Sequence, residues 1–404
     1  MLWLYNIAIR FYGLTVKIFS LFNSKAALFV KGRVAIFDKV HQKLDSNEKH
    51  IWFHFASLGE FEQGRPVLEK IKNSYPEKPI VITFFSPSGY EIRKDYKGAE
   101  GIFYLPLDTS NNAQKLIEAF NPEMAIFTKY EYWYHYYKRL SDKNIPILII
   151  SGIFRKEQIF FKWYGGLNRQ ILSFVSQFFV QNEESKSLLE SLKITNVTVS
   201  GDTRFDRVAE NAAAPKQTNF IAEFCVGQKV FIGGSTWPAD EQLIAELAKK
   251  HPEWKFIIAP HEIDQNHISS IQNLFPNAMK YSDQRQQVRA QTLIIDNIGL
   301  LSSIYQYGDI AYIGGGFGVG IHNTLEAAAF GIPVIFGPNY QRFQEAKDLL
   351  EIGAAISISN NEELMLAFDS LTNDKETGKR AKEYVNSRKG STAQIFDYIQ
   401  KVID

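Results

Sequence analysis

The sequence predicts an α/β protein in which two doubly wound domains face a cleft and an amphipathic, membrane-associated helix precedes them. Three observations predict this fold. Short, continuous apolar runs alternate with longer polar or amphipathic segments, which is the pattern of parallel strands joined by helical crossovers. The pattern stops at a polar stretch, Ala209 to Asn219, and then starts again. At 404 residues, the chain is also too long for one ordinary core, so two domains are expected.

Ten apolar runs account for the strands of the two predicted sheets. Each is separated from the next by a segment long enough for a helix. In the first domain the runs are Ile51 to Ala56, Pro79 to Phe84, Glu123 to Phe127, Ile145 to Ile150 and Gln177 to Val180. In the second they are Lys229 to Ile232, Trp254 to Ala259, Thr292 to Ile295, Asp309 to Ile313 and Ile332 to Phe336. We therefore divide the chain into a membrane-associated segment, 1–40, a first domain, 41–207, and a second domain, 208–404.

The first segment, Met1 to Phe29, is rich in large apolar residues but is interrupted by Arg10 and Lys17. A spanning helix needs about 20 residues with few or no charges, so the cations argue against one. We expect an amphipathic helix in the membrane interface, with its cations on anionic headgroups. The alternative is a helix packed on the protein's own core. The narrow polar stripe of this helix comprises Asn6, Arg10, Gly13, Lys17 and Ser20, and the positive charge continues at Lys25, Lys31 and Arg33, as is typical of a cytoplasmic face.

Composition argues against several classes of partner. Lys and Arg number 45 and Asp and Glu 44, a formal net charge of +1. A nucleic-acid-binding protein normally carries a basic excess, so no nucleic-acid partner is expected. The single cysteine, Cys225, rules out an internal disulfide and fits a reducing compartment. No Asp-x-Asp pair is present to hold a metal against a phosphate, and we expect neither a metal nor a cofactor.

Glu60 stands where an open α/β sheet places its ligands. The segment Ile51 to Arg65 indicates a strand that ends at Ser57 to Gly59 and a helix that follows, so Glu60 lies at the strand's carboxyl end. A carboxylate there can take the proton of a reacting hydroxyl, which typically contributes about 10²- to 10⁴-fold to a rate. The alternative is that Glu60 only stabilises the first turn of its helix through the helix dipole. His50 and His54 share one face of the strand without a third ligand, and we interpret both as structural.

Five glycines within seven residues follow a predicted strand and precede a short helix. A turn without side chains lets the backbone approach an anion, and N–H groups at a helix N-terminus point at it. Gly315 and Gly316 are therefore candidates for a phosphate site, although no strict G-x-G-x-x-G is present. Asn323 or Thr324 is expected to cap the helix. Asn323 and Glu326 also have the spacing of a capping box, so Glu326 has a structural as well as a functional interpretation.

The string from Gly314 to Pro338 contains Gly-x-His-Asn-x-Leu-Glu and ends in Pro-Val-x-Phe-Gly-Pro. It resembles the nucleotide-binding segment of the 3-deoxy-D-manno-octulosonic acid (Kdo) transferases, which build the inner core of lipopolysaccharide and have the GT-B glycosyltransferase fold. The resemblance implies that Glu326 holds the nucleotide ribose. Ala-Ser-Leu-Gly-Glu resembles the family motif whose Glu is the proposed base. This implies that role for Glu60, with Ser57 and Gly59 beside the substrate.

Two further segments of the first domain resemble the same family. Lys129 to His135 is similar to Glu-Thr-Glu-x-Trp-Pro-Asn, with Glu131 and Trp133 matching and the other positions departing from it. Glu131 is carried over as a second catalytic residue. Ser151 to Arg155 corresponds to an Asn-Ala-Arg segment, of which only Arg155 is retained. An arginine near a sugar that bears a carboxylate would bind it with two hydrogen bonds; the alternative is an arginine on a helix surface.

In the second domain, Gly233 to Glu241 resembles the family's Gly-Ser-Thr-His-x-Gly-Glu, with Trp237 in place of the His. Ser235 or Thr236 is expected to cap a helix here, and backbone N–H groups and hydroxyls would receive the leaving phosphate. The segment around His261 stands where the family has Pro-Arg-His-Pro-Glu. The basic Arg is missing, and His261 would take over part of its role.

The resemblance extends over most of the chain from about residue 50 onward and implies an acceptor-binding domain followed by a domain for the nucleotide sugar. The implied reaction is transfer of Kdo from its cytidine monophosphate ester, CMP-Kdo, to a lipid A precursor of the lipid IVA type, with inversion and without a metal. The implied location is the inner (cytoplasmic) membrane, with a peripheral or monotopic anchor and the catalytic domains on the cytoplasmic side. Two alternatives stay open: a sugar-nucleotide epimerase of the same fold, and a non-catalytic lipid-binding relative.

Overall fold

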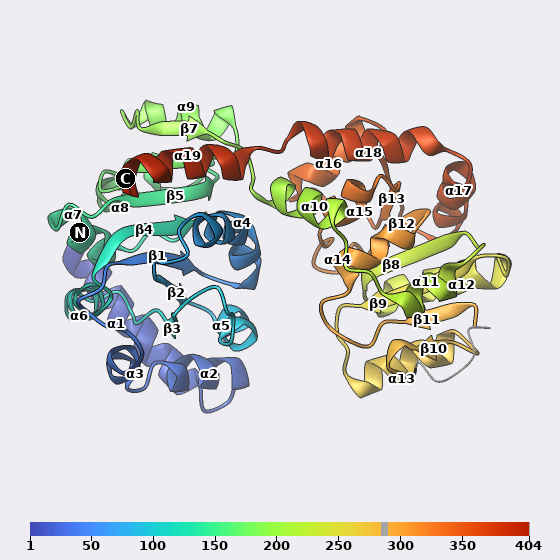
Figure 1. Ribbon diagram of the computed structural model, residues 1–404, viewed down its shortest axis with the longest axis horizontal. Helices are drawn as coiled ribbons and strands as arrows, with labels where there is room; N and C mark the ends of the chain where they lie inside the picture. Colours follow the sequence, from blue (N-terminus) through green and yellow to red (C-terminus); the bar gives the residue numbers. More distant parts are fainter. Residues whose placement is uncertain (284–289, 404) are drawn as a thin grey trace. The chain divides into compact units, whose positions relative to one another are not determined.

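The computed structural model describes residues 1–283 and 290–403. The chain forms two compact units, Met1–Asp206 with Gly390–Asp404, and Arg207–Lys389. Each unit contains one seven-stranded sheet in which all paired strands run parallel, with helices packed against it (Figure 1). This arrangement confirms the predicted α/β class with two parallel sheets.

All ten predicted strands are present, together with four short ones that the apolar runs do not predict. In the first unit the strands are β1 (His50–Phe55), β2 (Ile80–Phe84), β3 (Gly101–Tyr104), β4 (Pro122–Thr128), β5 (Ile147–Gly152), β6 (Gln177–Val180) and β7 (Val197–Val199), in the spatial order β3-β2-β1-β4-β5-β6-β7. In the second they are β8 (Val230–Thr236), β9 (Lys255–Pro260), β10 (Met279–Lys280), β11 (Thr292–Ile294), β12 (Ile310–Ile313), β13 (Val334–Phe336) and β14 (Ala355–Ser357), in the order β10-β11-β9-β8-β12-β13-β14.

Helices lie between most successive strands as crossovers, while the first helices precede β1 and the last ones follow β14. The first unit contains α1 (Leu2–Phe19), α2 (Ser24–Gly32), α3 (Ile36–Lys43), α4 (Leu58–Ser74), α5 (Pro87–Arg93), α6 (Ser110–Phe120), α7 (Tyr134–Asp142), α8 (Gly166–Leu172), α9 (Glu183–Ser191) and α19 (Ser391–Ile403). Helix α10 (Arg204–Ala213) begins in the first unit and ends in the second, which contains α11 (Asn219–Cys225), α12 (Pro238–Lys250), α13 (Gln265–Leu274), α14 (Leu301–Ile304), α15 (Leu325–Phe330), α16 (Gln344–Glu351), α17 (Asn361–Leu371) and α18 (Lys375–Ser387).

The sheet of the first unit is covered on both faces, which explains why its strands are continuous apolar runs rather than alternating ones. Every residue of β1 is buried. Successive side chains of a strand point to opposite faces. Accordingly, Trp52 packs in one core cluster with residues of α3, α6, α7 and α8, whereas Ile51 and Phe53 pack in another with residues of α4 and α19.

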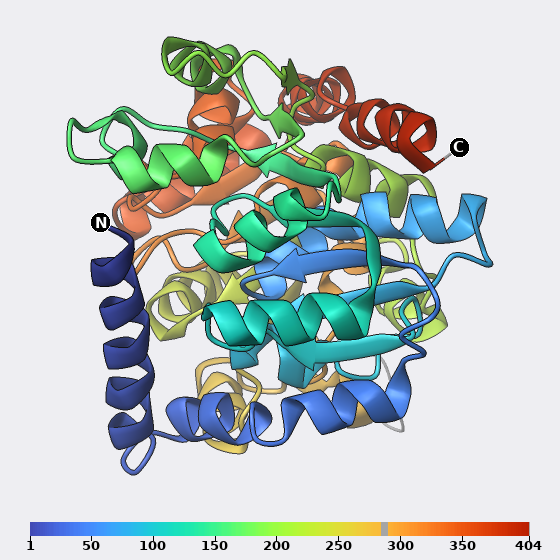
Figure 2. The same ribbon diagram turned by 90° about the vertical axis from the view of Figure 1, so that its left-hand side faces the viewer.

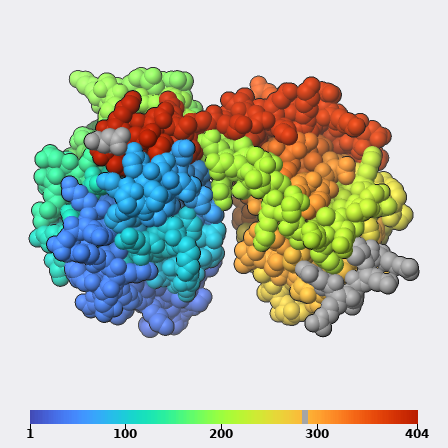
Figure 3. Space-filling model, viewed as in Figure 1, coloured from blue at the N-terminus to red at the C-terminus, as the bar shows by residue number. Residues whose placement is uncertain are grey.

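The last helix, α19, belongs to the first unit, whereas the division at residue 208 assigns it to the second domain. The physical reason is its apolar stripe: Ile395, Phe396 and Ile399 are buried in the same core cluster as α4. In Figure 3 the red atoms of α19 lie next to the blue atoms of α4. The carboxylate of Asp206 fixes the start of α19, because it accepts the N–H groups of Gly390 and Thr392, each at 2.7 Å.

Helix α1 packs on the first unit through polar, small and aromatic residues. Asn6 Oδ1 lies 2.6 Å from His135 Nε2. Gly13 lies so close to Leu107 that an added Cβ would come within 2.6 Å of its side chain. These two residues belong to the predicted polar stripe, so part of that stripe faces the protein. The alternative, a helix packed on the protein's own core, describes this inward side: Tyr5 packs against a core cluster and its hydroxyl donates to Asp108, although no residue of α1 is fully buried.

The opposite side of α1 is apolar and exposed. In Figure 2 the helix is the dark-blue element along one side of the first unit. Among the described residues, no helix combines the length and the apolar character needed to cross a bilayer. The exposed large apolar residues of α1 are Leu2, Trp3, Leu4, Ile7, Phe11, Tyr12, Leu14, Ile18 and Phe19.

The sequence predicts that Arg33 continues the positive charge that follows α1. In the structure its guanidinium is instead bound to backbone groups of the first unit. Its guanidinium donates hydrogen bonds to the carbonyl oxygens of Leu105, Phe29 and Phe85, at 2.8, 3.0 and 2.8 Å. Burial lowers its pKa from 12.5 to about 10. Arg33 therefore ties the end of α2 to the segments that follow β2 and β3.

Candidate functional site

The strand order of the first sheet has a switch point between β1 and β4, where open α/β sheets form a crevice. The chain runs from β1 outward to β2 and β3, and then returns to place β4 on the other side of β1. Ligands of open α/β sheets bind outside the carboxyl ends of the strands at such a switch point. Glu60 follows β1 and Glu131 follows β4, so the two predicted catalytic carboxylates flank this point.

Glu60 is the third residue of α4 and is largely buried. Its Oε2 accepts the backbone N–H of Ala56 at 2.5 Å. Burial, followed by the negative charge of Glu131, raises the pKa of Glu60 from 4.5 to about 7, against the opposing effects of the Ala56 hydrogen bond and of Lys129. A carboxylate with a pKa near the operating pH is suited to accept a proton in a reaction. The hydrogen bond to Ala56 also fastens the start of α4, so the structural role of Glu60 accompanies the chemical one.

A chain of hydrogen bonds holds Glu131. Its Oε2 lies 3.0 Å from Trp133 Nε1 and 3.1 Å from His54 Nε2. His54 Nδ1 lies 2.8 Å from Thr83 Oγ1. The same oxygen accepts the indole Nε1–H of Trp52 at 2.8 Å. These contacts are satisfied when the Thr83 hydroxyl donates to His54 Nδ1 and His54 Nε2–H donates to Glu131. His54 therefore positions Glu131, a role that is consistent with its structural interpretation from the sequence.

Lys129, like His54, lies at the candidate site without having been predicted there. It has a positive φ of 59° at the end of β4, two residues before Glu131. Its charge lowers the pKa of Glu60, so it lies within electrostatic reach of that carboxylate. The available signal is its departure from the family's Glu-Thr-Glu segment, which puts a cation beside two carboxylates.

The three predicted substrate-binding residues lie around the same switch point. Ser57 is the residue before α4, and Gly59 is exposed in its first turn. Arg155 is exposed in the loop after β5, not on a helix surface, and its Nη1 lies 3.3 Å from the hydroxyl of Tyr130. Because Tyr130 precedes Glu131, the guanidinium is beside the turn that carries the second carboxylate.

The second sheet has its own switch point, between β8 and β12. Ser235 has a positive φ of 53° near the end of β8, and Thr236 is buried with its hydroxyl donating to Glu241 at 2.9 Å. Neither residue caps α12. The residue before the helix is Trp237, whose N–H donates to Asp240 at 2.9 Å, and Pro238 is the first residue of the helix. The predicted cap is wrong because Thr236 still belongs to the strand.

Asp240, in the first turn of α12, joins this helix to β12 and to the glycine-rich turn. Fully buried, it accepts the N–H groups of Trp237 and Gly315, each at 2.9 Å, and the hydroxyl of Tyr312 at 2.8 Å. The N–H of Gly315 is therefore engaged within the protein. At Gly316 an added Cβ would come within 2.6 Å of the backbone of Gly337. Both glycines are needed for close backbone packing, whatever they contact in a ligand.

Three rings stack at the carboxyl ends of β8, β9 and β12. The ring of His261 lies 4.9 Å from that of Trp237 and 4.3 Å from that of His322. Trp237 Nε1–H donates to His322 Nε2 at 3.1 Å. Burial, followed by the charge of His261, lowers the pKa of His322 to about 4, so its ring is neutral at pH 7. Trp237 also lines a pocket of about 250 Å³ together with Asp240, Phe317 and neighbouring residues.

Asn323 and Glu326 form the local contacts expected of a cap. Asn323 Oδ1 accepts the N–H of Leu325 at 3.1 Å, and its amide donates to Glu326 Oε1 at 3.1 Å. Thr324, the other predicted cap, makes no such side-chain bond. Glu326 is half-buried at the start of α15. Glu326 therefore has a local structural contact with the side chain of Asn323, while its capping-box role and its contact with a ribose both stay predictions.

Comparisons with known proteins give the family. The model of the family "3-Deoxy-D-manno-octulosonic-acid transferase (kdotransferase)" matches residues 30–207. The chain is 23% identical to the 3-deoxy-D-manno-octulosonic acid transferase of Haemophilus influenzae, over 88% of this chain and 87% of that one. It is 26% identical to a bifunctional glycosyltransferase/methyltransferase of Fusobacterium nucleatum, over 84% of this chain but only 55% of that protein's length.

Among solved structures, the UDP-GlcNAc 2-epimerase from Neisseria meningitidis bound to UDP-GlcNAc matches with a TM-score of 0.61 and 18% identity, over 87% of this chain and 100% of that one. At this identity the likeness bears on the fold alone, which is GT-B-like. The matched residues 30–207 include β1, β4 and both carboxylates of the first switch point. Residues 30–207, the part of the chain that the family model matches, belong to the Kdo transferase family of glycosyltransferases.

Proposed function

We propose that this protein transfers Kdo from CMP-Kdo to a lipid A precursor, with Glu60 as the general base. The observation that carries the proposal is the raised pKa of Glu60, about 7, at the switch point of the first sheet. A general base has to be ionised in part at the working pH and still be basic enough to take a proton. Family membership supports the donor and acceptor classes, because relatives over most of the chain are 3-deoxy-D-manno-octulosonic acid transferases.

The proposed reaction is a single displacement. Glu60 takes the proton of the acceptor hydroxyl while the oxygen bonds to the anomeric carbon of Kdo. The bond from that carbon to the phosphate oxygen breaks on the opposite face, so CMP leaves and the configuration inverts. Glu131, held by His54 and Trp133, maintains the negative charge that keeps Glu60 basic. Arg155 binds the carboxylate of the sugar.

The second unit is proposed to bind the nucleotide. Glu326 contacts the ribose, and Asn323 holds that carboxylate in place through its amide. The proposed partners of the phosphate are Ser235, in the turn at the end of β8, and the exposed ring of His261. The other predicted hydroxyl, that of Thr236, is buried and donates to Glu241, so it stabilises this turn and does not face a ligand. No metal is included, because the sequence lacks an Asp-x-Asp pair.

We also propose that α1 lies in the interface of the inner membrane, on its cytoplasmic side. The apolar side of α1 faces away from the unit, with Trp3 63% and Phe11 66% exposed. A contiguous exposed apolar face of this kind marks an interaction site. The contacts of Asn6 and Gly13 with the unit fix which side of the helix faces outward. The acceptor is itself a lipid, which suits an enzyme placed at the membrane surface.

The activity is tested by incubating the protein with labelled CMP-Kdo and a lipid A precursor and weighing the product. Glu60→Gln should lower turnover at least about 10²-fold while CMP affinity, measured by calorimetry, is retained. Normal turnover in this variant would exclude Glu60 as the base. No product from the wild-type protein would favour a non-catalytic relative, and isomerisation of a nucleotide sugar without an acceptor would favour an epimerase.

The membrane site is tested with vesicles of phosphatidylethanolamine and phosphatidylglycerol. Replacing Ile7, Phe11 and Ile18 by Ser should reduce binding by at least about 10²-fold, since each buried apolar side chain contributes about 1.5–3 kcal/mol. The matched variant Arg10→Gln/Lys17→Gln should lose only the salt-sensitive part, about 1 kcal/mol per charge. Equal binding by the wild-type protein and the triple Ser variant would refute the interfacial helix.

A further inference from the structure

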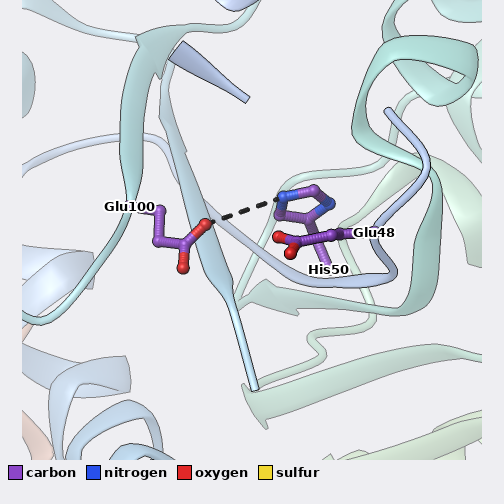
Figure 4. A group of neighbouring side chains, drawn as sticks. All are labelled: Glu48, His50 and Glu100. Atoms are coloured by element: carbon purple, nitrogen blue, oxygen red, sulfur yellow. Dashed lines mark ion pairs between the residues drawn. The ribbon is translucent and has the colours of Figure 1, made fainter. Parts of the chain in front are cut away.

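A cluster of one histidine and two glutamates lies at the amino end of the first sheet, far from the proposed chemistry. His50 is the first residue of β1, Glu48 precedes it by two residues, and Glu100 directly precedes β3. Figure 4 shows the carboxylates of Glu48 and Glu100 near the His50 ring, with the ion pair between Glu100 and the ring dashed. Because strand residues rise by about 3.3 Å each, the length of β1 places this cluster about 16–20 Å from Glu60. The cluster is therefore separate from the site at the carboxyl ends of the strands.

His50 is the residue that points to a ligand. Its side chain is fully buried, and neither ring nitrogen has a hydrogen-bond partner among the described residues. The Oε2 of Glu100 lies 3.9 Å from its Nε2, which is too long for a hydrogen bond. A buried polar group without a partner is unfavourable, and each such group needs an explanation such as a water or an ion. The main chain of His50 is fixed, since its N–H donates to the carbonyl oxygen of Asn121 at 3.2 Å.

We propose that Glu48, His50 and Glu100 bind a divalent transition metal, for which zinc is the best fit. One ligand atom from each of the three side chains lies within 4.8 Å of the other two. Zinc takes ligands at about 2.0–2.2 Å in a tetrahedron, so the ligand atoms would be about 3.4 Å apart. Both glutamates are exposed at the surface, and rotation of their side chains supplies the required approach of about 1 Å. The fourth position is then open to water.

The ligand types decide between classes of metal. Mg²⁺ and Ca²⁺ prefer oxygen ligands alone, whereas an imidazole nitrogen suits zinc and its neighbours in the first transition row. The two carboxylates balance the charge of a divalent ion. The competing explanation is a protonated His50 that forms ion pairs with both carboxylates, which needs no metal at all.

A metal here would act as a clamp. Glu48 belongs to the segment between α3 and β1, and Glu100 belongs to the segment between α5 and β3. The N–H of Glu100 donates to the carbonyl oxygen of Ile80 at 2.9 Å, so its backbone already lies beside the start of β2. A shared ion would join these two segments across the amino ends of three neighbouring strands. It stabilises the first unit and leaves the transfer step unchanged.

The test uses the full chain, freed of metal and titrated with zinc chloride by calorimetry and by thermal unfolding. The wild-type protein should bind one zinc at this site, and Tm should rise by about 5 °C or more at about 100-fold excess over Kd. Magnesium chloride should have no such effect. With Co²⁺ in place of zinc, visible d–d absorption should appear.

The deciding variant is Glu48→Gln/Glu100→Gln, because both residues are exposed and the change keeps their shape. It should lose at least about 10-fold in zinc affinity, as well as the rise in Tm. The matched control Glu77→Gln/Glu118→Gln alters two other exposed carboxylates of the same unit and should behave as the wild type. Absence of zinc binding to the wild-type protein would overturn the proposal. So would equal binding by the Glu48/Glu100 variant, because the ion would then lie elsewhere.

Discussion

The pH dependence of the transfer reaction should follow the ionisation of Glu60. Only the ionised carboxylate accepts a proton, and burial together with Glu131 raises its pKa from 4.5 to about 7. Such a base is about one-tenth ionised at pH 6 and about nine-tenths ionised at pH 8, so kcat/KM should rise about tenfold across this range. A base with the ordinary pKa of a glutamate would give a flat profile over the same range.

Two single substitutions should move the midpoint of this profile in opposite directions. Glu131→Gln removes a negative charge that disfavours ionised Glu60, so the pKa of Glu60 falls and the midpoint moves to lower pH. Lys129→Met removes a positive charge that favours ionised Glu60, so the midpoint moves to higher pH. Burial is the largest cause of the shift and is retained in both variants, so the midpoint of Glu131→Gln should stay above 4.5.

The assay is the initial rate of Kdo transfer at low donor concentration from pH 5 to pH 9, at constant ionic strength. The slope of log kcat/KM against pH should be about 1 below the midpoint. Movement of both variants in the same direction, or a flat wild-type profile between pH 6 and pH 8, would refute the assignment of Glu60. The measured midpoint belongs to the interacting carboxylates as a pair, so the direction of each shift is the decisive quantity.

Three further predictions concern the second unit. Glu326→Ala should weaken CMP binding and lower Tm. Glu326→Gln should keep the Tm of the wild type, because Gln also accepts from Asn323, but should still bind CMP poorly. Recovery of both Tm and CMP binding in the Gln variant would leave only the structural role of Glu326. Gly316→Ala should lower the free energy of unfolding in urea by about 1–3 kcal/mol, because the added Cβ would meet the backbone of Gly337. The control Gly318→Ala, whose added Cβ has its nearest contact at 3.7 Å, should change this free energy by no more than about 0.5 kcal/mol. Equal losses in the two variants would contradict the packing argument. His261→Gln should raise the pKa of His322 above about 4, yet keep it below 6.5 because burial remains, as followed by NMR titration; an unchanged value would show that the two rings do not interact electrostatically.

The strands could be predicted from the sequence where they are buried on both faces. The ten predicted runs all form strands, and the four strands without a prediction, β3, β7, β10 and β14, are the edges of the two sheets. Edge strands have one neighbour only and are short, here two to four residues. All three residues of β7 are only half-buried. A run this short and this exposed has no distinctive apolar pattern, whereas β3 is buried in all four residues and burial does not explain why it was missed.

Within the first site, local motifs could identify Glu60 and Glu131 but not the residues that surround them. The contact between His54 and Glu131 joins positions 77 apart in the chain, and it exists only because β1 and β4 are neighbours in the sheet. The helix start near Thr236 was misplaced by one residue because a hydroxyl is a common cap. In the structure that hydroxyl is inside the protein, bonded to Glu241.

The polar stripe of α1 was also visible in the sequence, but its direction was not. A narrow polar stripe on an apolar helix normally indicates the side that faces water or headgroups. Here Asn6 is satisfied by His135, and Gly13 permits a close approach to Leu107. Periodicity gives the two sides of a helix, and only the partners in the fold decide which side faces inward.

The candidate sites of the two units differ in their ionisable groups. The first site brings together Glu60, with its pKa of about 7, a second carboxylate and Lys129. In the second, His322 is neutral because its pKa is about 4, and Asp240 is held by three hydrogen-bond donors. The proposed proton acceptor therefore belongs to the first unit, and the proposed nucleotide site of the second contains stacked rings, close-packed glycines and polar groups that are already hydrogen-bonded. The pH dependence of turnover and the affinity for the nucleotide should accordingly respond to different substitutions.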